Sequence, residues 1–264
     1  MAHKEFVMNT YDGVEDLRGF SLQRLSAYRA ALLGKTQPQI NFINRWLVDP
    51  LNRPISVVEV GTGNGRLLIG MSLDESLSVG YGIDVSASRI EFAQDWYNSL
   101  SYTRPIRFRV ENVLTSNHSP YADLAVCITG CFNYFRPMGI EAPLKTLKYM
   151  RETADYGLFE LYKMPPKVAR MLSVLPDEYI RTWDLLPESD PWRYYLHGWL
   201  WDDHLRIMTH DKYFIADDGR IDNSKSEQLY YYSLWEFEEL LREAGYKEIL
   251  YSKENSTCQV ILAK

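Results

Sequence analysis

The stretch Val57-Val58-Glu59-Val60-Gly61-Thr62-Gly63-Asn64-Gly65-Arg66 decides the fold of this chain. Its β-branched residues are typical of a buried parallel strand, and the Arg66-Leu67-Leu68-Ile69 run predicts the start of a helix. Between them lie three glycines, which have no Cβ and let the backbone approach a ligand closely. The first N–H groups of the helix stay free to meet an acceptor. The stretch therefore predicts a ligand-binding turn between a strand and a helix.

Two phosphate-binding patterns do not fit this chain. A dinucleotide fingerprint needs G-x-G-x-x-G, but Arg66 stands where the third glycine belongs. Gly34-Lys35-Thr36 is no P-loop, because Arg29 stands where that pattern needs its first glycine. What remains is E-x-G-x-G-x-G, which resembles motif I of the class I S-adenosylmethionine-dependent methyltransferases. The motif alone leaves open a glycine-rich turn of some other doubly wound fold.

The following segments extend the resemblance. Gly82-Ile83-Asp84-Val85-Ser86 is similar to the second motif of that family. Its Asp84 carboxylate can accept hydrogen bonds from both ribose hydroxyls, a chemistry that Rossmann-like folds share. The resemblance further implies that Val85 packs on adenine. The alternative for Asp84 is an acid at a helix terminus without a ligand.

A third segment departs from the family pattern. After the expected strand 106–110, Asn112 stands where the family usually has an acid that accepts from the adenine amino group. An amide oxygen can still accept this bond, and Glu111 is the alternative if the register differs by one residue. The resemblance thus implies a cofactor site made of Glu59, Gly61, Thr62, Gly63, Asn64, Gly65, Asp84, Val85, Asn112, Val113, Thr129 and Gly130.

The order of elements predicts the fold class. Strands expected at 57–60, 79–83, 106–110, 123–129 and 156–162 alternate with helical stripes, including one through Ile140, Leu144 and Leu147. This alternation indicates a parallel sheet with helices on both faces. The run 232–246 resembles the penultimate helix of small-molecule class I methyltransferases, which implies that 246–252 and 257–263 form an antiparallel hairpin. We therefore expect an α/β fold with a doubly wound, mostly parallel seven-stranded sheet, an antiparallel C-terminal hairpin, N-terminal helices and an inserted lid after the fifth strand.

The expected domain is single, over 1–264, with a helical cover at 1–50. Within the cover, a helix over 14–33 would end at Gly34, and a second would begin near Pro38. Tyr11, Arg24 and Tyr28 are candidates to face the site.

The inserted lid, 163–229, has an unusual composition. Six Trp or Tyr residues fall within the nineteen positions 183–201. Asp217-Asp218-Gly219-Arg220 predicts a hairpin turn between apolar runs at 212–216 and 228–232. Ligands of open α/β sheets bind at the carboxyl edge, which the lid would cover. We expect an acceptor pocket with Asn133, Tyr134, Trp199 and Trp201.

The implied reaction needs few catalytic groups. An activated methyl group requires an acceptor atom held in line, so positioning supplies much of the rate. A hydroxyl or ammonium acceptor must lose a proton, and histidine is the natural base near neutral pH. His197, His204 and His210 are the candidates, although each taken singly is more often a surface or packing histidine.

Composition narrows the partners. The formal net charge of −6 disfavours a nucleic-acid partner, and no long stretch lacks charges, which disfavours a membrane partner. Cys127, Cys131 and Cys258 show no zinc spacing, so no metal is expected, and their odd count without a secretory signal indicates the cytoplasm. We expect a cytoplasmic S-adenosylmethionine-dependent methyltransferase acting on an oxygen or nitrogen of a small-molecule acceptor, with a homodimer as one way to bury the aromatic residues. The rivals are a protein or RNA methyltransferase and a non-catalytic interaction protein.

Overall fold

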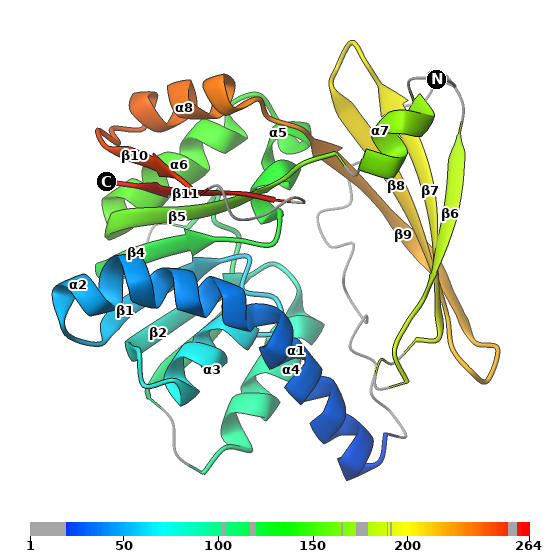
Figure 1. Cartoon of the computed structure of the whole chain (residues 1–264), viewed down its shortest axis with the longest axis horizontal. Coiled ribbons are helices and arrows are strands. Elements are labelled where there is room, and N and C mark those ends of the chain that lie inside the picture. Colours follow the sequence, from blue (N-terminus) through cyan, green and yellow to red (C-terminus); the bar gives the residue numbers. More distant parts are fainter. Residues whose placement is uncertain are drawn as a thin grey trace.

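The computed structural model describes residues 20–101, 104–116, 120–164, 166–172, 179–188, 190, 192–252 and 258–264. They form a larger sheet covered by helices and a smaller sheet that stands beside one edge of it (Figure 1). The larger sheet has the strand order β10-β11-β5-β4-β1-β2-β3, and the smaller has the order β6-β7-β8-β9. Among the described residues, no helix is both long and apolar enough to cross a membrane.

The larger sheet contains the strands that the sequence predicts. Its members are β1 (Ile55–Val60), β2 (Leu77–Asp84), β3 (Ile106–Val110), β4 (Ala122–Cys127), β5 (Ala154–Tyr162), β10 (Ile249–Tyr251) and β11 (Cys258–Ala263). The first five pair in parallel, whereas β11 runs antiparallel to both β5 and β10. The predicted mostly parallel, seven-stranded sheet with an antiparallel C-terminal hairpin is therefore confirmed.

Helices cover both faces of this sheet. Alternate residues of β4 enter opposite cores, with Leu124 and Val126 on one side and Ala125 and Cys127 on the other. The first core lies under α1 (Leu22–Ile43), α3 (Arg66–Leu73) and α4 (Ala87–Asn98). The second lies under α6 (Ala142–Thr153) and α8 (Leu234–Glu243), beside the short helices η2 (Cys131–Tyr134) and α5 (Phe135–Met138). Ile140 lies outside α6 and is exposed, so its place in the apolar stripe was wrong.

The N-terminal helices differ from the prediction. One continuous helix, α1, passes through Gly34 and Pro38, and is followed by η1 (Asn44–Val48) and α2 (Asp49–Leu51). Gly34 and Pro38 lie on the solvent side, while Leu32 and Ile40 are buried against the sheet layer. Packing of the buried face therefore outweighs the helix-breaking tendency of these two residues. Residues 14–19 of the predicted helix lie outside the described residues.

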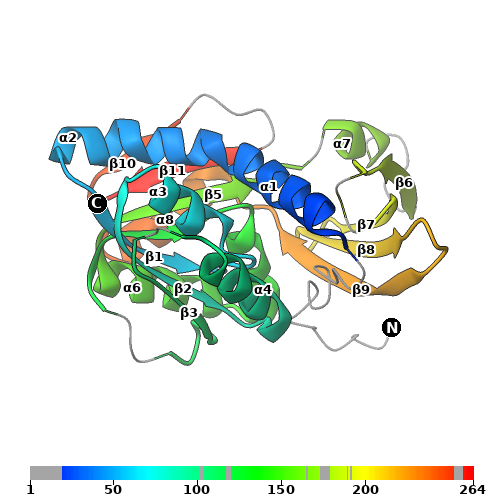
Figure 2. The same ribbon diagram turned by 90° about the horizontal axis from the view of Figure 1, so that it is seen from below.

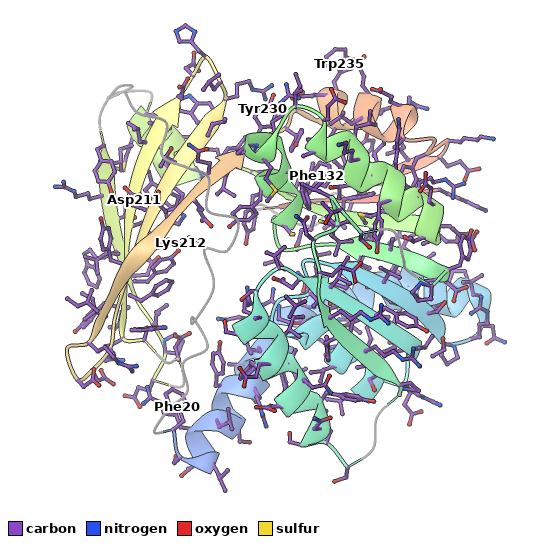
Figure 3. All side chains as sticks on the ribbon, turned by 180° about the vertical axis from the view of Figure 1, so that it is seen from behind. Phe20, Phe132, Asp211, Lys212, Tyr230 and Trp235 are labelled. Carbon is purple, nitrogen blue, oxygen red and sulfur yellow. The ribbon has the colours of Figure 1, made fainter. Side chains whose placement is uncertain are left out.

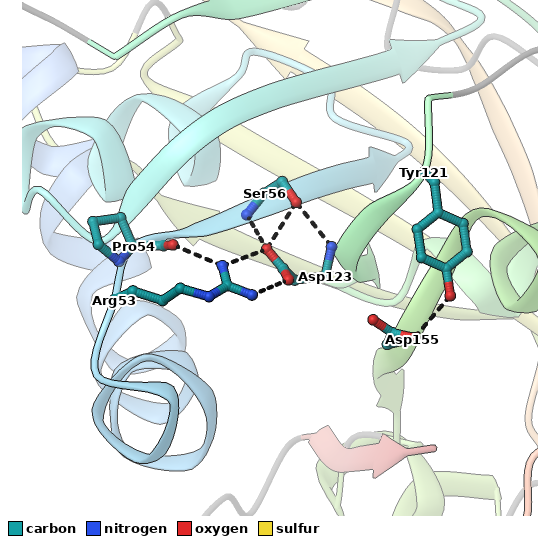
Figure 4. Close-up of polar contacts among 6 residues, drawn as sticks. All are labelled: Arg53, Pro54, Ser56, Tyr121, Asp123 and Asp155. Carbon is teal, nitrogen blue, oxygen red and sulfur yellow. Dashed lines mark hydrogen bonds and ion pairs between the residues drawn. The ribbon is translucent and has the colours of Figure 1, made fainter.

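A polar clamp joins β1 and β4 where both strands begin (Figure 4). The Arg53 guanidinium donates to both carboxylate oxygens of Asp123, at 3.0 and 2.5 Å. The same carboxylate accepts from the Ser56 backbone N–H at 2.7 Å. These bonds, first that of Arg53, lower the pKa of Asp123 to about 2. The clamp fixes the amino edge of the sheet, opposite the glycine turn.

The insertion forms a separate antiparallel sheet. After α7 (Pro166–Leu172), it contains β6 (Ile180–Leu185), β7 (Tyr194–Asp202), β8 (Ile207–Ile215) and β9 (Ile221–Tyr230). The predicted turn at 217–220 joins β8 to β9, although both strands are longer than the apolar runs suggested. This sheet stands opposite the carboxyl edge of the larger one (Figure 1), and α1 reaches it from the side (Figure 2).

One buried amide holds the junction between the two sheets. Asn133 is fully buried, its Nδ2 donates to the Tyr230 carbonyl at 2.7 Å, and its Oδ1 accepts from the Tyr162 N–H at 2.9 Å. It thereby joins the end of β5 to the end of β9. Figure 3 shows Tyr230 near this junction, Phe132 in the larger body and Lys212 in the smaller sheet.

Candidate active site

The glycine turn after β1 is shaped by close contacts. Gly61 has a φ of +72°, and a Cβ there would lie 2.2 Å from the Cys131 sulfur. Gly63 has a φ of +53°, and its Cβ would meet the Arg89 guanidinium at 2.8 Å. Conformation disfavours a side chain at both positions, and at Gly61 the Cys131 side chain also occupies the space, whereas the flexible Arg89 side chain at Gly63 could move aside. The turn between β1 and α3 brings bare backbone to the carboxyl edge of the sheet, as the sequence predicts.

Two acids hold the turn in place. Asp84, at the end of β2, accepts from the Gly63 N–H at 2.8 Å and from the Ser86 N–H at 2.9 Å. Glu59 is 3% exposed and accepts from the Thr62 hydroxyl at 2.7 Å. Burial raises the pKa of Glu59 to about 8, so this carboxyl holds its proton near neutral pH.

A cavity of about 360 Å³ opens over the turn. Ten of the twelve predicted cofactor residues line it: Glu59, Gly61, Thr62, Gly63, Asn64, Asp84, Val85, Asn112, Val113 and Thr129. Gly65 and Gly130 lie just outside the lining, each at a positive φ where a Cβ would strike a ring, that of Phe108 or Tyr162. The volume falls within the range of about 300–1,000 Å³ that small-molecule sites occupy.

Asn112 lines this cavity with part of its hydrogen-bonding capacity in use. Its Oδ1 accepts from the Leu114 N–H at 3.0 Å, which closes a turn after β3. An amide oxygen has two lone pairs, so the turn leaves one for a ligand. The alternative Glu111 also lines the cavity and accepts from the Ser116 hydroxyl.

A second cavity, of about 430 Å³, lies beneath the smaller sheet. It shares Tyr28, Tyr162 and Asp190 with the first cavity, so the two adjoin. Most of its other lining residues are aromatic or apolar: Leu186, Trp192, Tyr195, Trp199, Phe214, Leu229 and Tyr231. Its polar residues include His210 and Glu227, both buried.

The charged groups behind this cavity form a connected network. Glu227 accepts from the Lys212 ammonium and the Tyr134 hydroxyl, and it contacts His210 Nδ1 at 2.7 Å. Burial opposes ionisation of Glu227, but the charge of Lys212 and the bond to His210 outweigh it and lower its pKa to about 2. Burial lowers the pKa of His210 to about 4, despite the nearby carboxylate. Near neutral pH the network therefore holds an ionised Glu227 and a neutral His210.

Comparisons with known proteins give a likeness of fold only. Neither a protein-family profile nor any curated protein sequence matches the chain. Among solved structures, the CcbJ methyltransferase from Streptomyces caelestis superposes with a TM-score of 0.69 at 12% identity, over 99% of both chains. An S-adenosylmethionine-dependent methyltransferase from Clostridium acetobutylicum gives 0.65 at 13% identity, over 96% of this chain and 95% of the other. CalS10, an amino pentose methyltransferase from Micromonospora echinaspora, gives 0.64 at 13% identity, over 99% of both.

The chain has the fold of the class I S-adenosylmethionine-dependent methyltransferases. In this methyltransferase fold, the predicted catalytic and acceptor residues separate into two groups. His210 and Trp199 line the second cavity, and Tyr134 lines the first. His197 is buried directly behind His210, with its Nδ1 2.8 Å from His210 Nε2.

Besides His197, three of these predicted residues lie in neither lining. His204 sits on the exposed turn between β7 and β8. Trp201 packs against Tyr231 and donates to the Asp203 carboxylate at 3.2 Å. Both the amide N–H group and the oxygen of the Asn133 side chain are hydrogen-bonded to backbone groups at the junction. None of these three residues therefore lines either cavity.

The aromatic residues of the insertion are divided between the two faces of the smaller sheet. Trp183 and Tyr194 lie on the outer face of the smaller sheet, 65% and 41% exposed. In a strand, neighbours point to opposite faces, so a dense aromatic run is necessarily divided between them. Among the N-terminal candidates, Tyr28 lines both cavities, while the Arg24 side chain donates to backbone carbonyls of the insertion. Tyr11 lies outside the described residues.

Several residues of the site were not predicted from the sequence. Tyr162 ends β5, and its ring faces Gly130. Glu227 and Lys212 read as ordinary strand residues until β8 and β9 are paired. The alternation of inward and outward positions along these strands is the signal that could have pointed to Glu227 and Lys212.

Proposed function

We propose that the chain transfers a methyl group from S-adenosylmethionine to an oxygen or nitrogen atom of a small molecule. The observation that carries this proposal is the pair of adjoining cavities. One is built on the glycine turn and Asp84, and the other is aromatic with a buried carboxylate and histidine. A donor and an acceptor would meet at their shared wall, where Tyr28 and Tyr162 lie.

The first cavity fits the cofactor through its donor set. Bound there, S-adenosylmethionine would supply an electrophilic methyl group on a sulfonium centre. Asp84 would hold the ribose hydroxyls, because its carboxylate stands at the end of β2 in the lining. Val85 and Asn112 would contact the adenine, and the backbone of Gly61 and Gly63, which lines the cavity, would approach the amino-acid portion.

The second cavity suits a small acceptor. In this proposal, residues 163–229 form the lid that holds the acceptor, and the helices before residue 50 cover the cofactor. Rings such as those of Trp199 and Tyr195 can bind a cationic or planar group, while the Glu227 carboxylate favours an ammonium or a hydroxyl. Since fold neighbours include an amino pentose methyltransferase and a sugar N-methyltransferase, amino sugars belong among the acceptors to test first.

The cofactor assignment is tested by calorimetry on the purified chain. We expect S-adenosylmethionine and S-adenosylhomocysteine to bind, and NAD and ATP to bind far more weakly. Asp84→Ala should weaken the binding by up to about 1.5–3 kcal/mol for each charge-assisted bond lost. Binding of NAD without binding of S-adenosylmethionine or S-adenosylhomocysteine would refute the assignment.

The transfer itself is tested by mass spectrometry. Wild-type protein with the cofactor is incubated with a panel of amino sugars, simple amines and phenols, and a mass gain of one methyl group is sought. Peptides and RNA are tested in parallel, and a chain that binds the cofactor but methylates none of these acceptors would favour a non-catalytic interaction protein.

A further inference from the structure

The outer face of the smaller sheet carries a block of apolar side chains. The strand register places them in two neighbouring rows. The first row crosses β6, β7 and β8 and contains Trp183, Leu196 and Tyr213. The second row crosses all four strands and contains Leu185, Tyr194, Ile215 and Ile221. Paired residues of neighbouring strands share a face, as do alternate residues of one strand, so these side chains form one continuous surface, the apolar block.

The apolar block is open to solvent in the single chain. Ile215 is partly buried, and the other members of the block are between 36% and 65% exposed. The inner face of the same sheet lines the second cavity with Trp199 and His210 and packs against α7. The apolar block therefore points away from both cavities and from the larger sheet (Figure 1).

The size of the apolar block indicates a partner. Its exposed side chains present on the order of 600 Å² of apolar surface, which matches the largest patches that monomers leave in water, and such patches are often functional. Two such blocks in contact would bury about 1,200 Å² in total, which reaches the size of a stable protein interface. A single exposed Trp or Leu needs no partner, whereas a continuous block marks an interaction surface.

The residues at the border of the block indicate which partner fits. The next row along the sheet places Arg181 and Asp211 on either side of Gly198, so it carries one charge of each sign. Tyr179 joins the two, because its hydroxyl donates to Asp211 at 2.8 Å and the Arg181 guanidinium lies over its ring. Such a border favours neither a polyanion nor a polycation. Two identical faces, however, can set the positive part of one border opposite the negative part of the other.

We propose that this face is the interface of a homodimer, in which the apolar blocks of two copies of the chain pack against each other. The inference does not depend on the proposed function. The block contains no charged residue, and homodimer interfaces are more apolar than those of transient partners. Twofold dimers are also the commonest assemblies of soluble proteins. The two sheets would pack about 10 Å apart, as the sheets of a β-sandwich do.

This arrangement keeps both sites of the dimer intact. The two smaller sheets stand back to back, and the inner face of each remains turned towards its own larger sheet. Trp199 and His210 therefore keep their places in the second cavity of each copy. On the outer face, Trp183 and Tyr194 already pack together, with ring centroids 6.4 Å apart, and the dimer removes this pair from water.

The dimer is tested by the mass of the full-length protein in solution. Sedimentation equilibrium over a series of protein concentrations gives the dissociation constant of the dimer. We expect the wild type to be dimeric once its concentration exceeds about 10 μM. A wild type that stays monomeric up to about 100 μM would overturn the proposal, because a contact weaker than that is no stable interface.

Two matched substitutions locate the interface. Trp183→Glu places a charge in the apolar block and should raise the dissociation constant by at least about 30-fold, since a buried Trp is a typical hot spot of an interface. Trp235→Glu makes the same change on α8, where the Trp is 70% exposed outside the block, and should leave the constant unchanged. A dimer that persists in Trp183→Glu forms through another surface, and this result contradicts the assignment.

Further measurements separate loss of the dimer from loss of the fold. Circular dichroism shows whether each variant is folded. Should Trp183→Glu fold poorly, Leu196→Arg in the neighbouring strand repeats the test, with exposed Leu250→Arg on β10 as its control. Vesicles of phosphatidylcholine and phosphatidylglycerol test a lipid surface as the other occupant of the face. Wild-type protein that binds these vesicles as a monomer through Trp183 would overturn the homodimer.

Discussion

Gly61 shows how one residue can be constrained twice. Its φ is positive, and the sulfur of Cys131 occupies the space that a Cβ would need. Gly219, in the turn before β9, also has a positive φ, but nothing lies within 4 Å of its Cβ position. The two glycines therefore separate the cost of conformation from the cost of a clash.

We expect Gly61→Ala to destabilise the chain more than Gly219→Ala. Left-handed backbone costs a non-glycine residue about 1–2 kcal/mol, so the free energy of unfolding should fall by this amount in both variants. Overpacking adds about 1–3 kcal/mol at Gly61 alone. Urea unfolding measures both, and Cys131→Ala should recover part of the loss in the double variant by removing the sulfur. Equal losses in the two single variants would contradict the clash.

At the level of elements, α1 is the clearest departure from the prediction. Glycine and proline disfavour the interior of a helix. The sequence therefore predicted that one helix ends at Gly34 and that a second begins near Pro38. The structure keeps one helix, because Leu32, Thr36, Ile40 and Ile43 form one buried face along it. The helix stays continuous because this face packs against the rest of the protein, and local sequence patterns do not reveal that packing.

Two substitutions test whether α1 is continuous. Gly34→Ala should raise the free energy of unfolding by about 1 kcal/mol, since a Cβ there meets nothing within 4 Å and φ is not positive. Pro38→Ala should also stabilise, because it restores an N–H for the Gly34 carbonyl. A helix that ended at Gly34 would instead lose stability in Gly34→Ala. Thermal unfolding followed by circular dichroism distinguishes the two outcomes.

The sheet and the insertion differ in how far the sequence predicts them. Strands β1 to β5 follow from runs such as Val57–Val60 and from the glycine turn, because the signals are local. The polar network behind the second cavity depends on strand register, which brings His197 opposite Lys212 and His210 opposite Glu227. The register of β6 with β7 and of β8 with β9 cannot be read from their residues. The sequence therefore missed Asp184, which lies 2.9 Å from His197, and Glu227, although both histidines had been singled out.

For the whole molecule, two buried groups should shape stability as pH changes. Glu59 has a pKa raised to about 8, so the folded state holds a proton that the unfolded state has lost above about pH 4.5. Stability from this group falls as pH rises towards 8. His210 has a pKa lowered to about 4, so its contribution is lost as pH falls from about 6.5 towards 4.

We therefore expect the free energy of unfolding to decline between about pH 6.5 and 8. In that interval Glu59 alone of the two titrates differently in the folded state, with a slope of up to about 1.4 kcal/mol per pH unit. Glu59→Gln should remove the decline, while exposed Glu91→Gln should keep it. Chemical denaturation at a series of pH values measures both slopes. An unchanged slope in Glu59→Gln would contradict the burial of that carboxyl.

The bonds from Arg24 have a consequence for protein engineering. Its guanidinium donates to the backbone carbonyls of Glu188 and Asp190, at 3.1 and 2.8 Å. A side chain of α1 is thus hydrogen-bonded to the main chain of the insertion. Tyr28, one turn along the same helix, lines both cavities. A chimera that replaces only 163–229 with the corresponding segment of a protein of the same fold would therefore lose these contacts with α1. To transfer the proposed acceptor pocket to another protein, residues 20–43 and 163–229 should therefore be moved together.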